Sequence, residues 1–84
     1  MNSKDKKLYS KIVELLKTNG MYYDAEVFNG TITITVENGD WKHDHIALKN
    51  LMKSHGYIFI ERHITDEENG DDSFSATYLY MEEV

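Results

Sequence analysis

Histidines are the side chains in this 84-residue chain that are best suited to acid–base or metal chemistry. His43 and His45 lie two residues apart beside Asp40 and Asp44, and His55 follows. Two imidazoles at this spacing share one face of a strand, but they lie about 200° apart around a helix. Helical zinc sites instead space their histidines four residues apart. Because this segment resembles the start of a helix, we expect polar helix residues and no metal site.

A second candidate is His63, which follows Glu61 and Arg62 in a strand-like run. A histidine–carboxylate pair can transfer protons when it lines a pocket. No second catalytic group stands at a defined spacing, and the chain contains neither a phosphate-binding glycine loop nor a nucleophile elbow. The absence of cysteine excludes disulfides and thiolate metal ligands. We therefore expect a surface cross-strand charge pair, no catalytic residue, no cofactor and no enzymatic activity.

The acidic segment 66–72 reads Asp-Glu-Glu-Asn-Gly-Asp-Asp between two strand-like runs. A calcium-binding EF-hand loop requires alternating oxygen ligands, a central glycine and a glutamate at its twelfth position. This segment lacks that order, which excludes an EF-hand and leaves only weak, nonspecific cation binding. We expect a solvated hairpin tip.

Charge is divided unevenly along the chain. Residues 1–17 contain five lysines against Asp5 and Glu14, whereas the whole chain has a net charge of −6. From Tyr57 onward Arg62 is the only lysine or arginine, against eight carboxylates. Nucleic-acid binding depends on clustered Lys and Arg, which only the first helix could supply. A direct nucleic-acid interface is therefore not favoured.

The length predicts a single domain over residues 1–84. No run approaches the roughly 20 apolar residues of a membrane helix, and no apolar run follows the basic N-terminus as in a signal peptide. We expect a cytoplasmic protein without a membrane-spanning segment.

The first half predicts a helix and a hairpin. Apolar residues at helical spacing indicate a helix over about 4–19, with Ser3 as its N-cap and Gly20 as its left-handed C-terminal residue. Asn29-Gly30 favours a two-residue type I′ turn. The turn sets Val27 against Ile32, Ala25 against Ile34 and Tyr23 against Val36. The opposite face of this hairpin, which we call the outer face, then holds Tyr22, Asp24, Glu26 and Phe28 with the threonines.

The second half predicts the same order. A helix from Trp41 or Asp44 to His55 precedes strands over about 57–65 and 73–81, and Asp40 or Asp44 caps the helix. Alternation in the first of these strands places Ile58, Ile60 and Ile64 inward, with Arg62 as an inward exception or the mark of a bulge. The outward set is Tyr57, Phe59, Glu61 and His63. Alternation leaves two choices for the second strand, with either Leu79 and Met81 or Phe74, Tyr78 and Tyr80 inward.

A short repeat supports the duplicated order. Residues 14–20 and 50–56 share a Leu-(Leu/Met)-Lys-(Thr/Ser)-x-Gly pattern before an aromatic run. The two αββ half-repeats would be 1–37 and 40–84, although any amphipathic helix that ends in glycine before a strand gives a similar pattern. We predict an α+β two-layer sandwich in αββαββ order, with a four-stranded antiparallel sheet and both helices on one face.

The uncovered sheet face is the remaining candidate site. We expect it to bind a protein, because its aromatic side chains are surrounded by carboxylates that would repel phosphates. We expect four aromatic anchors, which are Tyr57, Phe59, Tyr78 and Tyr80. The expected acidic contacts are Asp24, Glu26 and Glu61 on the strands and Asp66, Glu67, Glu68, Asp71 and Asp72 in the turn.

Three classes of function are compatible with these features. The first is an acidic inhibitor that blocks the nucleic-acid-binding groove of a basic protein, in the manner of a DNA mimic. In size, charge and lack of cysteine the chain resembles phage-encoded anti-defence proteins, including anti-CRISPR and anti-restriction inhibitors, and this resemblance rests on no motif. The second is a homodimeric interaction module that pairs through its sheet. The third is a nucleic-acid binder that uses the lysines of the first helix.

Overall fold

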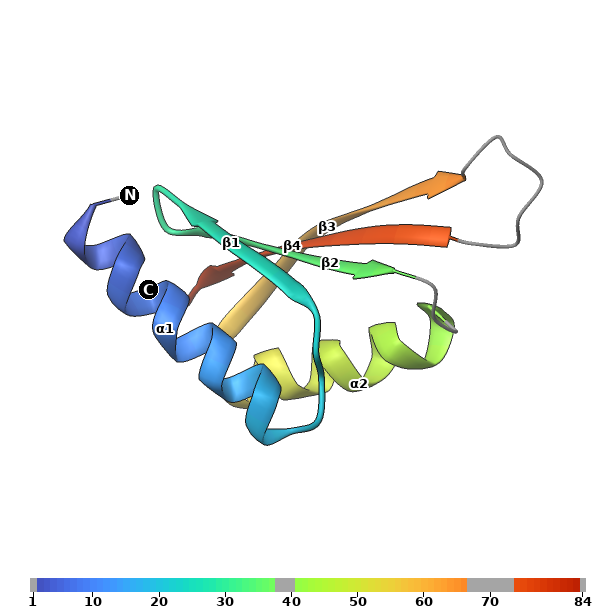
Figure 1. The fold of residues 1–84 in the computed structure, drawn as a ribbon, viewed down its shortest axis with the longest axis horizontal. Coiled ribbons are helices and arrows are strands. Elements are labelled where there is room, and N and C mark those ends of the chain that lie inside the picture. Colours follow the sequence, from blue (N-terminus) through green and yellow to red (C-terminus); the bar gives the residue numbers. More distant parts are fainter. Residues whose placement is uncertain (1, 38–40, 67–73, 84) are drawn as a thin grey trace.

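Helices and β-hairpins alternate along the part of the chain that the structure describes (Figure 1). The computed structural model describes residues 2–37, 41–66 and 74–83, without the side chains of 37, 41–45, 64–66 and 74. The elements are α1 (Ser3–Thr18), β1 (Asp24–Phe28), β2 (Thr31–Glu37), α2 (Trp41–Ser54), β3 (Tyr57–Asp66) and β4 (Phe74–Glu82). The four strands form one antiparallel sheet in the order β1-β2-β4-β3. The predicted α+β class and αββαββ order are confirmed.

The ends of α1 follow from local hydrogen bonds. Asn2, and not the predicted Ser3, caps the helix, because its side-chain oxygen accepts a hydrogen bond of 2.8 Å from the backbone N–H three residues on. At the other end Gly20 has a φ of 72°, as predicted for a left-handed C-terminal residue. The Met21 N–H then donates to the Leu16 carbonyl at 2.8 Å, which closes the last turn.

The turn between β1 and β2 is tied to the start of α1. Asn29 and Gly30 have φ values of 49° and 80°, which confirms the predicted type I′ turn. Their two backbone N–H groups donate to the carboxylate of Asp5, at 3.0 and 3.1 Å. Asp5 is buried, so this carboxylate joins helix and hairpin where little water competes for its hydrogen bonds.

The β1–β2 register agrees with the sequence pattern close to the turn. The confirmed pairs are Val27 with Ile32 and Ala25 with Ile34. The third predicted pair, Tyr23 with Val36, is not formed, because β1 begins only at Asp24. Tyr22, Asp24, Glu26 and Phe28 are all exposed, as predicted for the outer face of this hairpin.

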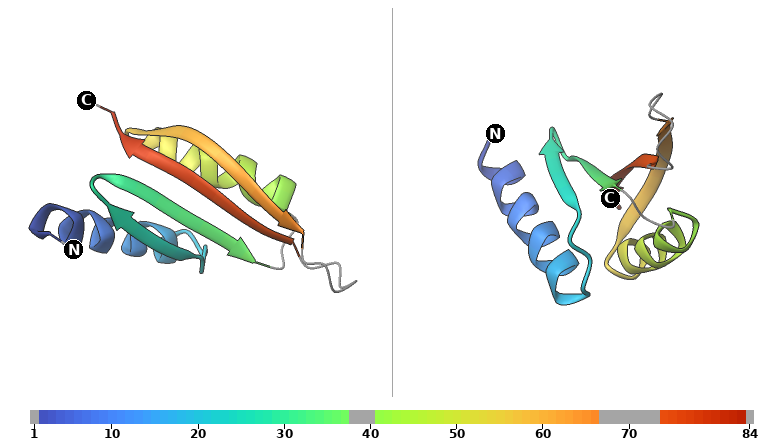
Figure 2. Two further views of the ribbon diagram at one scale, coloured as in Figure 1. Left: turned by 90° about the horizontal axis from the view of Figure 1, so that it is seen from above. Right: turned by 45° about the vertical axis from the view of Figure 1, so that its right-hand side comes forward.

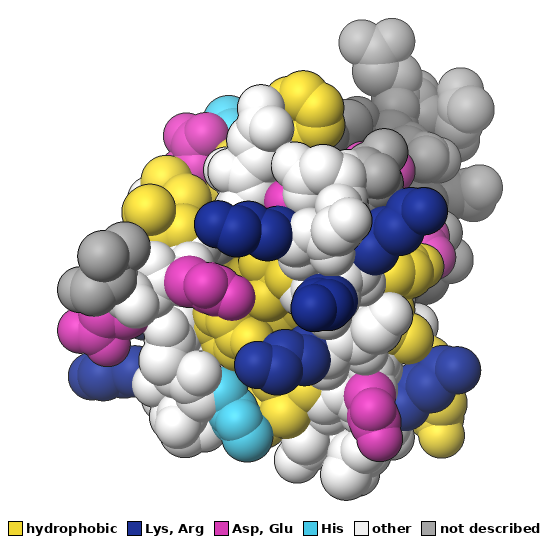
Figure 3. Space-filling view, turned by 90° about the vertical axis from the view of Figure 1, so that its left-hand side faces the viewer, with side chains coloured by type: hydrophobic (Ala, Val, Ile, Leu, Met, Phe, Trp, Pro, Cys, Tyr) yellow, Lys and Arg dark blue, Asp and Glu magenta, His cyan; other side chains and the backbone are white. Residues whose placement is uncertain are grey.

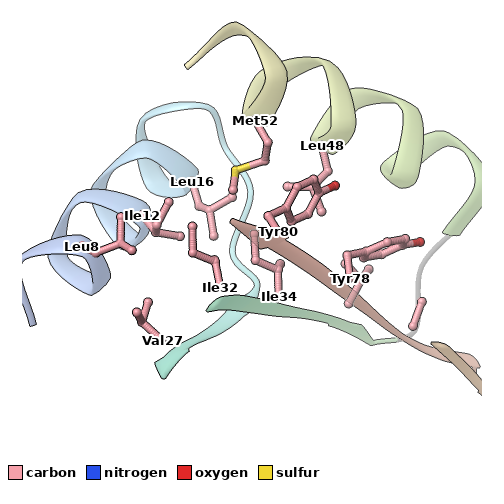
Figure 4. Packing of buried hydrophobic residues seen from close by; sticks show 12 residues of the cluster. Leu8, Ile12, Leu16, Val27, Ile32, Ile34, Leu48, Met52, Tyr78 and Tyr80 are labelled. Atoms are coloured by element: carbon pink, nitrogen blue, oxygen red, sulfur yellow. The ribbon is translucent and has the colours of Figure 1, made fainter. Parts of the chain in front are cut away.

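One buried cluster joins both helices to the sheet (Figure 4). Its members are Leu8, Ile12 and Leu16 of α1, Leu48 and Met52 of α2, and Val27, Ile32, Ile34, Val36, Ala76, Tyr78 and Tyr80 of the strands. Figure 1 shows α1 and α2 on the same side of the sheet, α1 beside β1 and α2 beside β3. The sheet positions in the cluster therefore form an inner face, and the alternate positions form the outer face.

The halves are arranged symmetrically about the β2–β4 ladder. Ile34 lies opposite Tyr78 at the middle of this ladder, with β1 and β3 at the two sheet edges. In each half a pair of buried helix residues stands eight and four positions before a glycine of positive φ, Gly20 or Gly56. The pairs of equivalent residues are Ile12 with Leu48 and Leu16 with Met52.

The helix α2 begins at Trp41, the earlier of its two predicted starts. Asp44 therefore lies inside the helix and is not its N-cap, while Asp40, the other predicted cap, lies outside the described residues.

The predicted inner face of β3 is wrong at its start. Ile58 and Ile60 are each 45% exposed, whereas Tyr57 and Phe59 are half-buried and pack against the cluster. The register shifts between Phe59 and Glu61, so Ile60 is the extra residue of a β-bulge. Because of this extra residue, the strand before Glu61 presents the opposite faces from those that uninterrupted alternation predicts. Strict alternation therefore assigns residues 57–60 to the wrong faces of the sheet.

The choice that alternation left open in β4 is settled by the register. Ala76, Tyr78 and Tyr80 are buried on the inner face, and Met81 is 42% exposed on the outer face. Arg62 lies opposite Tyr78, so its backbone position is inward, which is one of the two alternatives that the sequence left open. The bulge lies at Ile60 and not at Arg62.

Removal of the Asp5 carboxylate should destabilise the fold. Asp5→Ala leaves two partly buried N–H groups without their acceptor, and we expect the free energy of unfolding to fall by about 1–3 kcal/mol. Urea unfolding followed by circular dichroism measures this difference. Glu14→Ala, which removes an exposed carboxylate from the same helix, is the control. Equal stability of the two variants would show that the carboxylate does not hold the turn.

Candidate interaction surface

The outer face of the sheet is not covered by either helix. Figure 2 (left) looks onto this face, with the four strands in front and both helices behind them. Antiparallel sheets can leave one face in water, but such a face is normally polar along its whole length. On this outer face polar and apolar side chains are instead divided into separate rows that run across the strands.

The middle row carries a carboxylate at each edge. Glu26 on β1 pairs with Thr33, Thr33 with Leu79, and Leu79 with Glu61 on β3. Three strand spacings separate the two glutamates, a distance of roughly 14 Å across the sheet. Both glutamates are exposed, whereas Thr33 and Leu79 between them are half-buried.

The neighbouring row toward the Asn29–Gly30 turn is apolar. Phe28 pairs with Thr31, Thr31 with Met81, and Met81 with Ile58. The exposed fractions are 75% for Phe28, 42% for Met81 and 45% for Ile58. Ile60, also 45% exposed, extends this apolar surface at the β3 edge. Exposed apolar groups that lie together in this way are typical of interaction surfaces.

The third row adds further charge. Asp24 lies at the β1 edge, and His63 occupies the equivalent position at the β3 edge through the pairs with Thr35 and Thr77. The His63 Nε2 lies 3.2 Å from the Glu61 Oε1, and both side chains are more than half exposed. An exposed pair of this kind contributes at most about 1 kcal/mol. Because both residues lie on β3, it is not the cross-strand pair that the sequence predicted. No lysine or arginine pairs into these three rows of the described sheet.

The four predicted aromatic anchors are absent from the outer face. Tyr78 and Tyr80 are fully buried, and Tyr57 and Phe59 are half-buried on the inner side. The Phe59 ring meets the Tyr80 ring edge-on, with the centroids 5.7 Å apart, and the Lys49 ammonium lies 5.3 Å from the Phe59 centroid. Both contacts favour this inward placement of Phe59. The predicted outward placement of these four aromatic residues is therefore wrong, whereas Tyr22 and Phe28 are exposed as predicted.

The predicted acidic contacts have different outcomes. Asp24, Glu26 and Glu61 are exposed on the outer face, as the sequence predicted. Asp66 is the last residue of β3, but its side chain is not described. Four of the predicted acidic contacts lie outside the described residues, namely Glu67, Glu68, Asp71 and Asp72.

Sequence alternation placed Ile58 and Ile60 on the wrong face and left the face of Met81 open. No local pattern in the sequence indicates their common placement, because it depends on the bulge at Ile60 and on the pairing of β4 with its two neighbours.

The four predicted candidate histidines are only partly described. His43 and His45 lie within α2, but their side chains are not described. His55 follows α2 and is exposed. Among the side chains that the structure describes, no group of three His, Asp or Glu could hold a metal ion.

Comparisons with known proteins give no match: no family model, no curated protein and no solved structure is significantly similar to this chain. Within the described ranges, neither α1 nor α2 has the length and apolar character needed to cross a membrane.

Tyr80 should make stability depend on alkaline pH. Burial, with a smaller effect of Tyr78, raises the pKa of the Tyr80 phenol above its ordinary value of about 10. The unfolded chain therefore releases this proton at a lower pH than the folded chain does. We expect the free energy of unfolding to fall as the pH rises above about 10.

The variant Tyr80→Phe should weaken this fall, and urea unfolding at pH 8 and pH 11 tests it. The Tyr80 hydroxyl has no hydrogen-bond partner among the described residues, so the variant should lose no more than about 1 kcal/mol at pH 8. Tyr22→Phe, which alters an exposed tyrosine, is the control. If both variants keep the pH dependence of the wild type, the burial of Tyr80 is not its source.

Proposed function

We propose that the protein is a small acidic protein-binding module, and that its outer face binds a basic surface of another protein. The observation that carries this proposal is the combination of Glu26, Asp24 and Glu61 at the sheet edges with exposed Phe28 and Met81 in the neighbouring row. Carboxylates that flank apolar side chains complement a partner whose Lys and Arg side chains flank an apolar patch.

The arrangement of charge favours such a partner over a second copy of this chain. Two outer faces packed against each other would bring edge carboxylates of one copy close to those of the other. Like charges placed together in an interface cost several kcal/mol. A homodimer that buries Phe28, Met81 and Ile58 is the competing arrangement, because these exposed side chains would gain from burial.

We further propose that the basic surface is a groove that binds nucleic acid, and that the module inhibits it. Such grooves concentrate Lys and Arg, so they offer the charge that the outer face complements. The sequence adds further acidic residues in segment 66–72, which contribute to the negative charge that attracts a basic partner. This part of the proposal requires that the module and nucleic acid exclude each other on the partner.

The first test compares three charge reversals in a pull-down. Glu26→Lys and Glu61→Lys alter the outer face, whereas Glu14→Lys makes the same change of charge on exposed α1. Each immobilised protein is incubated with nuclease-treated bacterial lysate, and bound proteins are identified by mass spectrometry. We expect a basic protein to be retained by the wild type and Glu14→Lys but lost from both outer-face variants. Retention by all four would contradict the proposed surface.

Two further measurements test inhibition of the nucleic-acid-binding groove and the competing homodimer. In a competition assay, the wild-type module should displace a labelled oligonucleotide from the partner, and simultaneous binding of both would exclude inhibition of the groove. Sedimentation velocity of the module alone tests the homodimer. Self-association that persists at high salt and disappears in Phe28→Ser would favour the homodimer instead.

A further inference from the structure

A groove follows α1 on another side of the molecule. Its larger hollow, about 920 Å³, lies among the N-terminal half of α1, Glu82 and the 29–30 turn. A smaller hollow of about 460 Å³ lies among the C-terminal half of α1, His55 and Tyr57. Lys11 and Glu14 line both hollows, so the two adjoin along α1, and together we call them the α1 groove.

The α1 groove has an apolar floor and a basic rim. Its hydrophobic lining residues are Leu8, Leu15 and Tyr57. The larger hollow is also lined by Lys4, Lys6, Lys7 and Lys11. In Figure 3 hydrophobic surface is visible in a hollow between lysine side chains, and the hollow is open to the viewer. The groove is thus suited to a molecule that is apolar on one side and negatively charged on the other.

Charge varies along the groove. The lysines line its end at the start of α1, where the helix dipole adds positive potential. Asp5 also lines this end, but its carboxylate accepts the turn N–H groups. Glu14 lies farther along the helix, and Glu82 lies on the opposite wall. An extended polyanion such as nucleic acid would meet both of these carboxylates, and it would make little use of the apolar floor.

The length of the groove matches a segment of helix. α1 contains 16 residues, which corresponds to about 24 Å of groove. Amphipathic helices bind open apolar grooves through side chains spaced three or four residues apart. An open groove of this length suits such a helix better than a single acyl chain, which is usually enclosed on most sides.

We propose that the α1 groove binds an amphipathic helix of a partner protein whose polar side is acidic. The acidic end of this helix lies over Lys4, Lys7 and Lys11, and its apolar side chains contact Leu8 and Leu15. This site is independent of the proposed function of the outer face, because Asp24, Glu26 and Glu61 do not line the groove. The protein would then have two binding surfaces of opposite charge.

The test uses fluorescein-labelled model peptides. The probe is a 16-residue helical peptide with leucines at helical spacing and glutamates between them. One comparison peptide has lysine in place of glutamate, and the other has the probe composition in scrambled order. We expect fluorescence anisotropy to show saturable binding of the probe and at least about tenfold weaker binding of both comparison peptides. Backbone amide NMR shifts should change along α1 and at Tyr57, and not at Glu26 or Thr33.

A matched pair of variants locates the site. Lys7→Glu/Lys11→Glu should weaken probe binding at least about tenfold. Lys17→Glu/Lys53→Glu makes the same change of charge at exposed lysines that line neither hollow, and binding should change less than about threefold at physiological salt. Dispersed amide spectra check that each variant is folded.

Four results would overturn the proposal. One is the absence of saturable binding, and another is equal binding of the probe and either comparison peptide. The third is displacement of the probe by dodecanoate or by a single-stranded oligonucleotide that itself binds more tightly. That last result would assign the groove to an anionic amphiphile or to nucleic acid. Changes in amide NMR shifts that are confined to outer-face residues would also exclude binding of the probe in the α1 groove. Such a result would not test whether the outer face binds a basic partner.

Discussion

The pairing of β2 with β4 is the interaction on which the rest of the structure depends. Each half of the chain supplies only a helix and a two-stranded hairpin, and an isolated hairpin is marginally stable in water. The β2–β4 ladder joins the hairpins edge to edge and places Ile34 opposite Tyr78 in the middle of a four-stranded sheet. Both helices can then bury their apolar sides in one shared cluster. The same ladder leaves β1 and β3 as the sheet edges, where the charged outer-face residues lie.

The bulge at Ile60 determines the chemistry of the outer face. Without the extra residue, the inward placement of Phe59 would continue by alternation to Glu61, and its carboxylate would face the helices. With the bulge, Glu61 pairs with Leu79 and aligns with Glu26 across the sheet, while Ile60 remains exposed beside it. Bulges in edge strands also interrupt the regular ladder that would otherwise be open to another strand. One inserted residue therefore both interrupts the edge and completes the row of carboxylates.

The sequence predicted the features that local chemistry decides. Asn29-Gly30 specifies its own turn, and the strict alternation after it leaves one register for the first hairpin. The second hairpin could not be predicted in the same way, because aromatic, aliphatic and charged residues alternate there with one extra residue. The Asp5 contact with the 29–30 turn joins residues far apart in sequence, so no local pattern indicates it. The apolar row is missed for a related reason, since it depends on the order of all four strands.

Charge and apolar area have separate roles on the outer face. The edge carboxylates act over a Debye length and therefore influence how fast a basic partner arrives, in a manner that salt weakens. Phe28, Met81 and Ile58 act only on contact, so their burial influences how slowly the partner leaves. Because the apolar row lies beside the row of carboxylates and does not surround it, a partner steered by charge must also arrive in one orientation to bury Phe28. The positions of the two rows on the sheet therefore determine one orientation for the bound partner. Neither the net charge nor the amount of exposed apolar surface would determine that orientation alone.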